Sequence, residues 1–543
     1  MSVLRPMGTE LEYGILDRDH PNANPVQLSF DVIDAVATSA RRHIRWDYRG
    51  EDPINDARGY HLPRASARAD MLTDEPQRFI TNTVSDFGAR CYVDHAHPEY
   101  SSAEVNTPRA AVAATMLGDT LMLSAAQILQ TQGRNIHLYR STTDGKGASW
   151  GAHESYQISR IVPFEQLADL MLAHFSSRIV LVGAGRVGIG ERSERAGFQI
   201  SQRADFMHAK LGLQTTFERP IVNTRDESHS SSAMRRLHVI SGDANCMPIP
   251  NMIKLGATSM LAWLAECAYD PACKEYTPAA FAALLDGVVP EDPVRAIHEF
   301  SHDLALQVKV PVRSGQQLTA LEIQHRLFDE VHSVGAAVYG IADDESENSG
   351  DINREKQLVC WPDQDTALVM QLWQQVLDDL DTLTGISDEE RLFARDAASR
   401  IEWLLKWQII ERIRRKLHTN WAAAQCAACD IAWGALDPEE SLYAKVSGNV
   451  QPLPNLDNIP NSKAEQYRAL YTQGLTDRAR LRVALLNKWP QSIRALSWSS
   501  IVVCDTEGNI HDIRMQTPDD AATQRRLQVI ANSSSIEDVL RHW

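Results

Sequence analysis

The chain has 543 residues, of which 43% are hydrophobic, and this is enough for a large buried core spread over more than one domain. Its formal net charge of -17 argues against nucleic acid as a partner, because phosphate contacts dominate that kind of affinity. The sequence opens with no recognisable targeting signal and shows no apolar run long enough to span a bilayer, so we expect a soluble, cytoplasmic protein that binds no membrane.

The first predicted element is a short strand near the N-terminus, in which Glu10 and Glu12 alternate with Leu11 and Tyr13. Side chains two residues apart lie on the same face of a strand, so both carboxylates point the same way. Two buried carboxylates held side by side repel each other and require a cation, for which Mg²⁺ is the natural candidate. An acidic surface strand is the alternative, and for this motif alone it is the better one.

A second predicted strand, at residues 92–100, also alternates acids and imidazoles along one face. Tyr92, Asp94 and Glu99 would add oxygen ligands to those of the first strand. Neither motif is decisive by itself, but together they predict a carboxylate-rich site for a metal and a nucleotide.

The remaining elements indicate an α+β fold or alternating α/β units. Thr107 and Pro108 form a typical helix start, a capping side chain followed by proline at the first helical position. The long helix that they open would pack behind the catalytic strand. Apolar spacing predicts helices at residues 30–43, 107–129, 255–268, 365–383 and 389–416, and branched residues predict strands at 135–139 and 178–182.

A segment rich in proline and asparagine, residues 448–463, is the best candidate for a linker. It divides the chain into a catalytic domain, residues 1–462, and a small C-terminal domain, residues 463–543. The small domain is expected to contain a strand at 498–504, a turn at 505–508 and a short terminal helix.

Two motifs invite other functions. Residues 178–188 match the pattern of a strand followed by Gly-x-Gly-x-x-Gly, which binds dinucleotides when a helix begins at the third glycine. The residues after Gly188 are rich in glycine and charge instead, so a nicotinamide or flavin enzyme is the weaker hypothesis. Cys426 and Cys429 have no second cysteine pair and no nearby histidine pair, and we expect free thiols on a helix.

Many segments resemble the Pup ligase and depupylase family, whose members attach or remove the prokaryotic ubiquitin-like protein Pup. The resemblance covers the first half of the chain densely and the rest thinly. It implies a glutamine-synthetase-like α+β fold, an antiparallel sheet packed with helices. The matching segments are residues 8–15, 92–102, 146–149, 153–156, 183–190, 198–205, 223–227, 236–240 and 242–245.

Two features favour the depupylase branch of this family over its ligases. Asp94 is followed by His95 and Ala96, where ligases have a Gly-Ser pair before His-Pro-Glu-Tyr. A polar insertion at about residues 46–77 resembles the loop that marks depupylases. The resemblance therefore implies a hydrolase that depends on ATP and magnesium, cleaves the isopeptide bond between Pup and target lysines, and deamidates the C-terminal Gln of Pup to Glu.

The resemblance also implies roles for individual residues. Asp94 would be the catalytic aspartate, acting either as nucleophile or as base, and Arg225 would help to stabilise the oxyanion. The cofactors would be Mg²⁺ and ATP, or ADP with phosphate, with the nucleotide not consumed at each turnover. The expected nucleotide contacts are Arg90, Ser102 and Trp498, and the expected metal ligands are Glu10, Glu12, Tyr92, Glu99 and His238. His153 is a further candidate for the site.

Two alternatives remain, a ligase of the same fold and a protein that binds nucleotide and tag but has lost turnover. The expected partners are Pup, an acidic disordered tag, and pupylated proteins. A basic run at residues 412–416 would suit such a tag, although basic runs are usually solvated faces.

Overall fold

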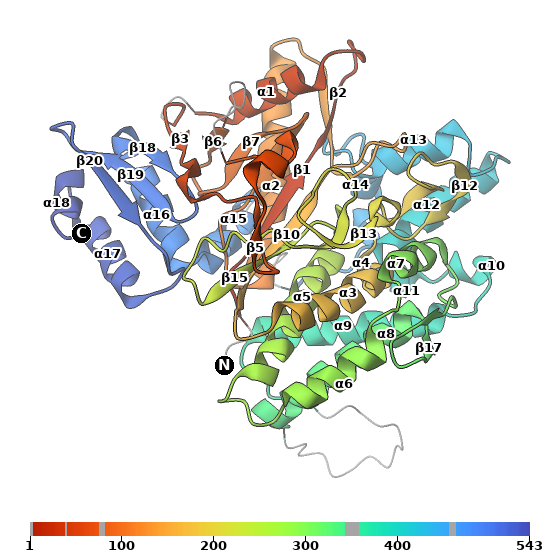
Figure 1. Cartoon of the computed structure of the whole chain (residues 1–543). Coiled ribbons are helices and arrows are strands. Elements are labelled where there is room, and N and C mark those ends of the chain that lie inside the picture. The colour runs from red at the N-terminus through yellow and green to blue at the C-terminus, as the bar shows by residue number, and fades with distance from the viewer. Residues whose placement is uncertain (1–3, 39–40, 75–81, 343–357, 455–462) are drawn as a thin grey trace.

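The computed structural model describes residues 4–38, 41–74, 82–342, 358–454 and 463–543. Within them, the centre of the molecule is an eight-stranded sheet with the order β13-β14-β15-β10-β1-β8-β7-β6 (Figure 1). All neighbouring strands in this sheet are antiparallel except β13 and β14, so the predicted α+β fold is confirmed. The strands are β1 (Met7–Glu12), β6 (Asn82–Val84), β7 (Arg90–Asp94), β8 (His97–Ser101), β10 (Ala152–Ser159), β13 (Ala209–Gly212), β14 (Pro220–Asn223) and β15 (Met234–Val239).

The register of the sheet explains why acids and histidines converge in its middle. Glu10 of β1 pairs with His153 of β10 on one side and with Ser101 of β8 on the other. Glu12 pairs with Glu99 of β8. Residues opposite each other in an antiparallel pair project from the same face, so these side chains form one polar patch.

Helices cover the apolar face of the sheet. Helix α1 (Pro25–Val36) packs against β7 and β8, α2 (Pro108–Thr131) against β1, α3 (Phe164–Ser177) against β14 and α5 (Pro248–Tyr269) against β10. The predicted start of the long helix is confirmed, because the Thr107 side chain accepts a hydrogen bond from Ala110 N. The core helix predicted at residues 255–268 is likewise the body of α5.

Helix α2 is long and apolar enough to cross a membrane by length and composition, so the expectation that no stretch could do so is wrong on those criteria. However, 56% of its most apolar stretch is buried inside the protein. The helix packs between β1, α1, α5 and α15 (Lys463–Gly474), which are the contacts of a core helix.

Further helices and four short strand pairs complete the larger part of the chain. In Figure 1 most of these helices lie on the opposite side of the central sheet from the C-terminal elements. The helices are α6 (Pro278–Val288), α7 (Pro293–His302), α8 (Ala320–Tyr339), α9 (Gln364–Leu383), α13 (Ala424–Trp433) and α14 (Leu442–Val446). The pairs join β2 (Gly14–Asp17) to β9 (Ile136–Tyr139), β4 (Asn55–Asp56) to β5 (Tyr60–His61), β11 (Arg186–Ile189) to β12 (Arg195–Gln199) and β16 (Val310–Pro311) to β17 (Gln317–Leu318).

Four predicted elements differ from the structure. The single strand expected at residues 92–100 is a hairpin of β7 and β8, because the chain turns at His95 and Ala96. The helix expected at residues 30–43 starts earlier, because Asn24 caps it and Pro25 occupies its first position. The strand expected at 178–182 is a helical turn, α4 (Ile179–Val182), since a short, fully buried apolar run fits either structure. The helix expected at 389–416 is three helices, α10 (Asp388–Arg391), α11 (Arg395–Ala398) and α12 (Glu402–Lys416), and extended backbone at Ile401 separates the last two.

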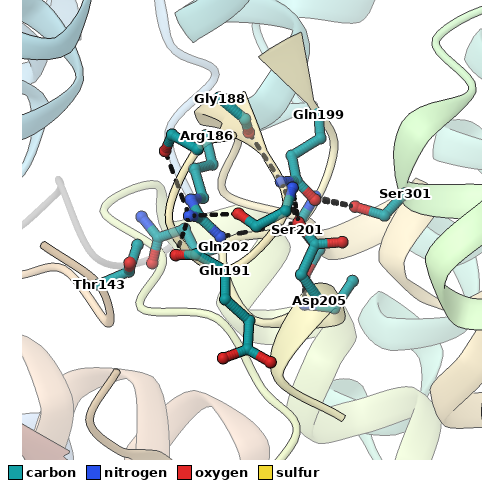
Figure 2. A network of polar contacts seen from close by, with 12 residues as sticks. Thr143, Arg186, Gly188, Glu191, Gln199, Ser201, Gln202, Asp205 and Ser301 are labelled. Carbon is teal, nitrogen blue, oxygen red and sulfur yellow. Dashed lines mark hydrogen bonds and ion pairs between the residues drawn. The ribbon is translucent and has the colours of Figure 1, made fainter. Parts of the chain in front are cut away.

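The glycine motif that resembled a dinucleotide-binding loop forms the β11–β12 hairpin. No helix begins at Gly188, where φ is 94°, so the nicotinamide or flavin hypothesis is wrong. The buried Arg186 guanidinium donates 2.8 Å hydrogen bonds to the carbonyls of Gly190 and Glu191 and so holds the hairpin tip (Figure 2). Elsewhere, Cys426 and Cys429 are free thiols on α13, as expected.

The C-terminal elements form a second, smaller sheet with its own hydrophobic core. The sheet has the order β20 (Ile510–Arg514), β19 (Ser500–Cys504), β18 (Ile493–Leu496) and β3 (Arg45–Trp46), and the helices are α16 (Asp477–Lys488), α17 (Ala521–Asn532) and α18 (Ile536–Leu540). The predicted strand, turn and terminal helix are present. The domain boundary at residue 462 stays a prediction, since residues 455–462 lie outside the described part of the chain and β3 joins this sheet from far upstream.

Candidate active site

A cavity of about 920 Å³ opens on the polar patch of the central sheet and gathers most of the predicted site residues. Its floor comes from β1, β7, β8, β10 and β15. Loop residues of the 46–77 insertion and the segment between β18 and β19 form part of its walls. The predicted residues that line it are Glu10, Arg90, Tyr92, Asp94, Glu99, His153, Arg225, His238 and Trp498.

Three carboxylates crowd together at one edge of this cavity, where Asp94 and Glu99 line it and Glu12 lies beside it. Single oxygens of Glu12, Asp94 and Glu99 all lie within 4.8 Å of one another. Burial, followed by repulsion from Asp94, Glu10 and Glu12, raises the pKa of Glu99 well above its ordinary value. Without a cation, these three carboxylates repel one another. Their oxygens are suited to bind a hard divalent ion, which prefers carboxylate ligands.

A second potential ligand group consists of Glu10, His153 and His238, whose nearest ligand atoms also lie within 4.8 Å of one another. Neither ring nitrogen of the buried His238 has a hydrogen-bond partner among the described residues. Its Nε2 lies 3.8 Å from Glu10 Oε2, and burial together with Arg236 lowers the pKa of His238 to about 3. A neutral, buried imidazole whose unprotonated nitrogen has no hydrogen-bond partner among the described residues is suited to bind a metal ion.

Asp94 lies at the end of β7, directly before the tight turn to β8. His95 in this turn has a φ of 52°, a conformation that costs energy for a residue other than glycine. His95 Nδ1 is 3.1 Å from Asp94 Oδ1. Burial alone would raise the pKa of Asp94, but His95, with His153 and His97, brings it below its ordinary value. Asp94 is therefore ionised at neutral pH and can act as a nucleophile or as a base.

Arg225 belongs to a buried group of charges on the opposite side of the cavity. Its Nε donates to Glu227 Oε2 at 2.5 Å and its Nη2 to Thr73 Oγ1 at 3.0 Å. Burial would raise the pKa of Glu227, but Arg225 lowers it to about 2. Arg236 Nη2 donates to Glu10 Oε1 at 3.0 Å, so this group reaches the metal-ligand set.

Two predicted site residues do not line this cavity. Glu12 lies beside it, and its Oε1 accepts a 2.9 Å hydrogen bond from Gly151 N. Ser102 lines an adjoining, more apolar cavity of about 620 Å³, and its Oγ accepts a hydrogen bond from Thr9 N. Glu10, Arg236 and Trp498 line both cavities, which are therefore neighbours.

Sequence reasoning did not identify several residues that line the main cavity. They are Tyr48, Glu51, Thr73, His95, Ser101, Thr215, His229 and Arg236. The sequence could have indicated some of them, because the first three lie in the polar insertion and Arg236 lies in a segment with family resemblance. Backbone pairing with the Arg225 loop holds the insertion in place. Asp56 and Arg225 form an isolated antiparallel β-bridge, and Ala57 N donates a hydrogen bond to Thr224 O at 2.8 Å.

Comparison with known proteins identifies relatives along nearly the whole chain. The family model described as Pup-ligase protein matches residues 5–502. A protein named depupylase from Acidothermus cellulolyticus is 34% identical over 92% of this chain and 90% of its own length. A Pup deamidase/depupylase from Mycolicibacterium smegmatis is 33% identical over 92% and 91%. A Pup–protein ligase from Micrococcus luteus is 30% identical over 80% and 86%.

Solved structures have the same fold. The complex between Pup and its ligase PafA matches with a TM-score of 0.70 and 20% identity, covering 99% of this chain and 94% of that one. PafA in complex with ADP matches with a TM-score of 0.64 and 22% identity, covering 87% and 96%. At these identities the solved structures support the fold alone. The sequence relatives, at 30% identity or more, support membership of the same family. This chain belongs to the Pup-ligase protein family.

Proposed function

We propose that this protein is an ATP- and magnesium-dependent hydrolase that cleaves the isopeptide bond between Pup and target lysines and deamidates the C-terminal Gln of Pup. The observation that carries the proposal is that oxygens of Asp94, Glu12 and Glu99 lie within 4.8 Å of one another, with Asp94 and Glu99 lining the cavity. The depupylase names of the relatives at 32% to 34% identity support the hydrolytic direction. His95 and Ala96, in the turn between β7 and β8, stand where ligases of the family have a Gly-Ser pair, and this difference also favours a hydrolase.

Magnesium would be held by Glu10, Glu12, Tyr92, Glu99 and His238. The unpartnered His238 nitrogens and the raised pKa of Glu99 both fit a bound cation. When bound, the ion would supply positive charge that offsets the carboxylates and polarises the oxygens next to it. Arg90 in the main cavity, Ser102 in the adjoining one and Trp498, which lines both, would hold the nucleotide.

Asp94 can promote hydrolysis in two ways. As a base, it takes a proton from water, whose oxygen attacks the side-chain carbonyl carbon at the C-terminus of the tag. As a nucleophile, its carboxylate attacks that carbon and forms an anhydride, which water then hydrolyses. In both routes the carbonyl oxygen becomes an oxyanion near Arg225, and the amine leaves with a proton, as ammonia or as the lysine of the target.

The expected partners are therefore Pup and pupylated proteins in the cytoplasm, with neither nucleic acid nor membrane involved. The net charge of -17 agrees with the absence of a nucleic-acid role.

The test is an assay with ATP, Mg²⁺ and three substrates: a Gln-ended tag, a Glu-ended tag with a lysine acceptor, and a purified conjugate. We expect ammonia from the first and free tag from the third, both reduced by about 100-fold to 10,000-fold in Asp94→Asn. Formation of conjugate from the second, with ADP produced in step, would instead identify a ligase. Binding of Mg-ATP and tag without any reaction would identify a protein that has lost turnover.

The matched control is Asp86→Asn, which removes an exposed carboxylate that pairs with Arg468 at 2.6 Å. Exposed ion pairs contribute little to stability, so this variant should keep the activity of the wild type. Equal losses in both variants would mean that Asp94 has no special role.

A further inference from the structure

Arg90 lines the main cavity without an ion pair to any carboxylate among the described residues. Its Nε donates to Asn82 Oδ1 at 2.8 Å and its Nη2 to Tyr48 OH at 3.3 Å. Aromatic rings surround it instead, with its guanidinium carbon 3.9 Å from the Tyr92 ring centroid and 4.3 Å from that of Trp46. Arginine is well suited to such stacking, which holds the group in place and leaves its charge available to an anion.

Trp46 contacts two of the three side chains expected to bind the nucleotide, Arg90 of the central sheet and Trp498 between β18 and β19. Besides Arg90, it meets the Trp498 ring edge-on, with 4.9 Å between ring centroids and 71° between planes. It is 6% exposed, and its Nε1 donates to Glu51 Oε1 at 3.1 Å. Trp46 is not among the residues that line either cavity, so it acts on a ligand there through the side chains that it contacts, Arg90, Trp498 and Glu51.

The small C-terminal sheet fixes the position of Trp46. Trp46 lies on β3, opposite Leu496 of the parallel strand β18. The next residue, Asp47, donates its N–H to Leu496 O at 2.8 Å, and its carboxylate accepts a 2.6 Å hydrogen bond from Ser500 Oγ. The indole that supports Arg90 is therefore held by strands that lie about 450 residues downstream, as the separation of 453 between Asp47 and Ser500 records.

We propose that Trp46 is a positioning residue for the nucleotide, an inference that rests on the nucleotide binding proposed above. It holds the Arg90 guanidinium and the Trp498 ring where the nucleotide binds. Nucleotide binding and the order of the C-terminal sheet are coupled through this one side chain. A bound nucleotide accordingly slows local opening of β18, β19 and β20, because anything that binds only the ordered state stabilises it.

The experiment measures binding of Mg-ADP to the full chain by calorimetry, and the ATP concentration that gives half-maximal conjugate cleavage together with kcat. Trp46→Ala should weaken Mg-ADP binding by about 10-fold to 100-fold, the usual range for loss of a supporting contact, and raise the half-maximal ATP concentration similarly. The value of kcat at saturating ATP should change less than about threefold. Trp46→Phe, which keeps an aromatic face, should recover most of the affinity.

Ile44→Ala is the matched control, because Ile44 belongs to the same hydrophobic core, is 4% exposed and lines neither cavity. It should lower thermal stability as Trp46→Ala does, yet leave Mg-ADP affinity within about twofold, as expected for a substitution that only removes buried apolar volume. Equal weakening in Ile44→Ala, or unchanged affinity in Trp46→Ala, overturns the proposal.

Two further readouts keep the test decisive. If Trp46→Ala does not fold, hydrogen exchange of the wild type decides: Mg-ADP must slow exchange in β18, β19 and β20, and unchanged exchange there overturns the coupling. If the wild type itself does not bind Mg-ADP, the nucleotide part of the proposed function fails and this inference falls with it. That outcome is distinct from a wild type that binds and a Trp46→Ala variant that binds equally well.

Discussion

The two ends of the main cavity are built in different ways. The carboxylate end, made of Glu12, Asp94 and Glu99, comes from neighbouring strands of one antiparallel sheet whose hydrogen bonds fix their spacing. The arginine end, around Arg90 and Arg225, is completed by loops and by the C-terminal sheet. Arg90 lies on β7 itself, but the side chains that hold Arg90 and Arg225, such as Trp46 and Thr73, come from segments far apart in sequence.

The two ends therefore serve different purposes, the carboxylate end for chemistry with a bound cation and the part of the arginine end around Arg90 for binding. The carboxylates repel one another, and only a rigid ladder can keep them close enough to share a cation. The arginines need no such crowding, because aromatic rings and Glu227 hold them individually. We therefore expect substitutions at the carboxylate end to abolish chemistry, and substitutions around Arg90 to change affinity and the docking of the C-terminal sheet.

The largest effect should come from Glu99→Gln, which removes one charge from the crowded carboxylates. Activity should fall at least about 100-fold, because a metal ligand matters at least as much as the groups that support it. The metal-free protein should become more stable by about 1–3 kcal/mol, since repulsion among carboxylates whose oxygens lie within 4.8 Å of one another is relieved. Chemical unfolding in the presence of a chelator measures the second effect.

This prediction requires that Glu99→Gln lower the activity and raise the free energy of unfolding at the same time. Glu275→Gln, an exposed substitution, should change neither quantity. If the chelated Glu99→Gln protein were less stable than the wild type, the carboxylates would not be in conflict, and the contrast between the two ends would disappear.

The carboxylate end was predictable in part, because the signals within each strand are local, but the turn at His95 and Ala96 that folds residues 92–100 into a hairpin was not predicted. Alternation with a period of two residues is enough to align Glu10 with Glu12, and the cap at Thr107 is set by its immediate neighbours. Residues 178–182 were misassigned because a short apolar run that is buried on all sides has no periodicity to read.

The arginine end was only partly predictable, because its contacts are made at long range. Resemblance identified Arg90, Arg225 and Trp498, but not that Trp46 joins the first to the third. No periodicity in the sequence states that β3 pairs with β18, so this contact emerges only from packing of the whole chain.

A second, intermediate effect tests how the C-terminal sheet is docked. Glu104 accepts hydrogen bonds from Arg478 and Arg482 of α16. Burial would raise the pKa of Glu104, but these two arginines lower it to about 2. A carboxyl with a depressed pKa stabilises the folded state above its ordinary pKa, near 4.5, and this stabilisation is lost as the pH falls toward 2.

Glu104→Gln should therefore lower the free energy of unfolding by about 3 kcal/mol at pH 7, and the difference from the wild type should shrink toward zero between pH 4.5 and pH 2. Denaturant titrations of both proteins across this range measure it. Glu439→Gln, at an exposed position, should show no such pH-dependent difference. A difference that stayed constant with pH would show that α16 is not docked through this ionised carboxylate.

The smallest effect is expected at the basic run, where sequence alone left open a surface for an acidic tag. Arg415 donates to Glu411 at 2.7 Å and to Glu389 at 3.2 Å, and Arg414 also donates to Glu411. Unlike Arg90, these arginines have carboxylate partners that offset their charge. Arg415→Gln should accordingly change KM for the tag by less than about twofold, as is usual for exposed ion pairs.

Tag titrations at low and moderate salt would show whether this contrast between the two kinds of arginine holds. An increase in KM of fivefold or more, larger at low salt, would mean that the tag competes successfully with Glu411 and Glu389 for Arg415. Arginines on the surface of α12 would then bind the tag in addition to those that line the cavity, and the arginine end would extend beyond the cavity.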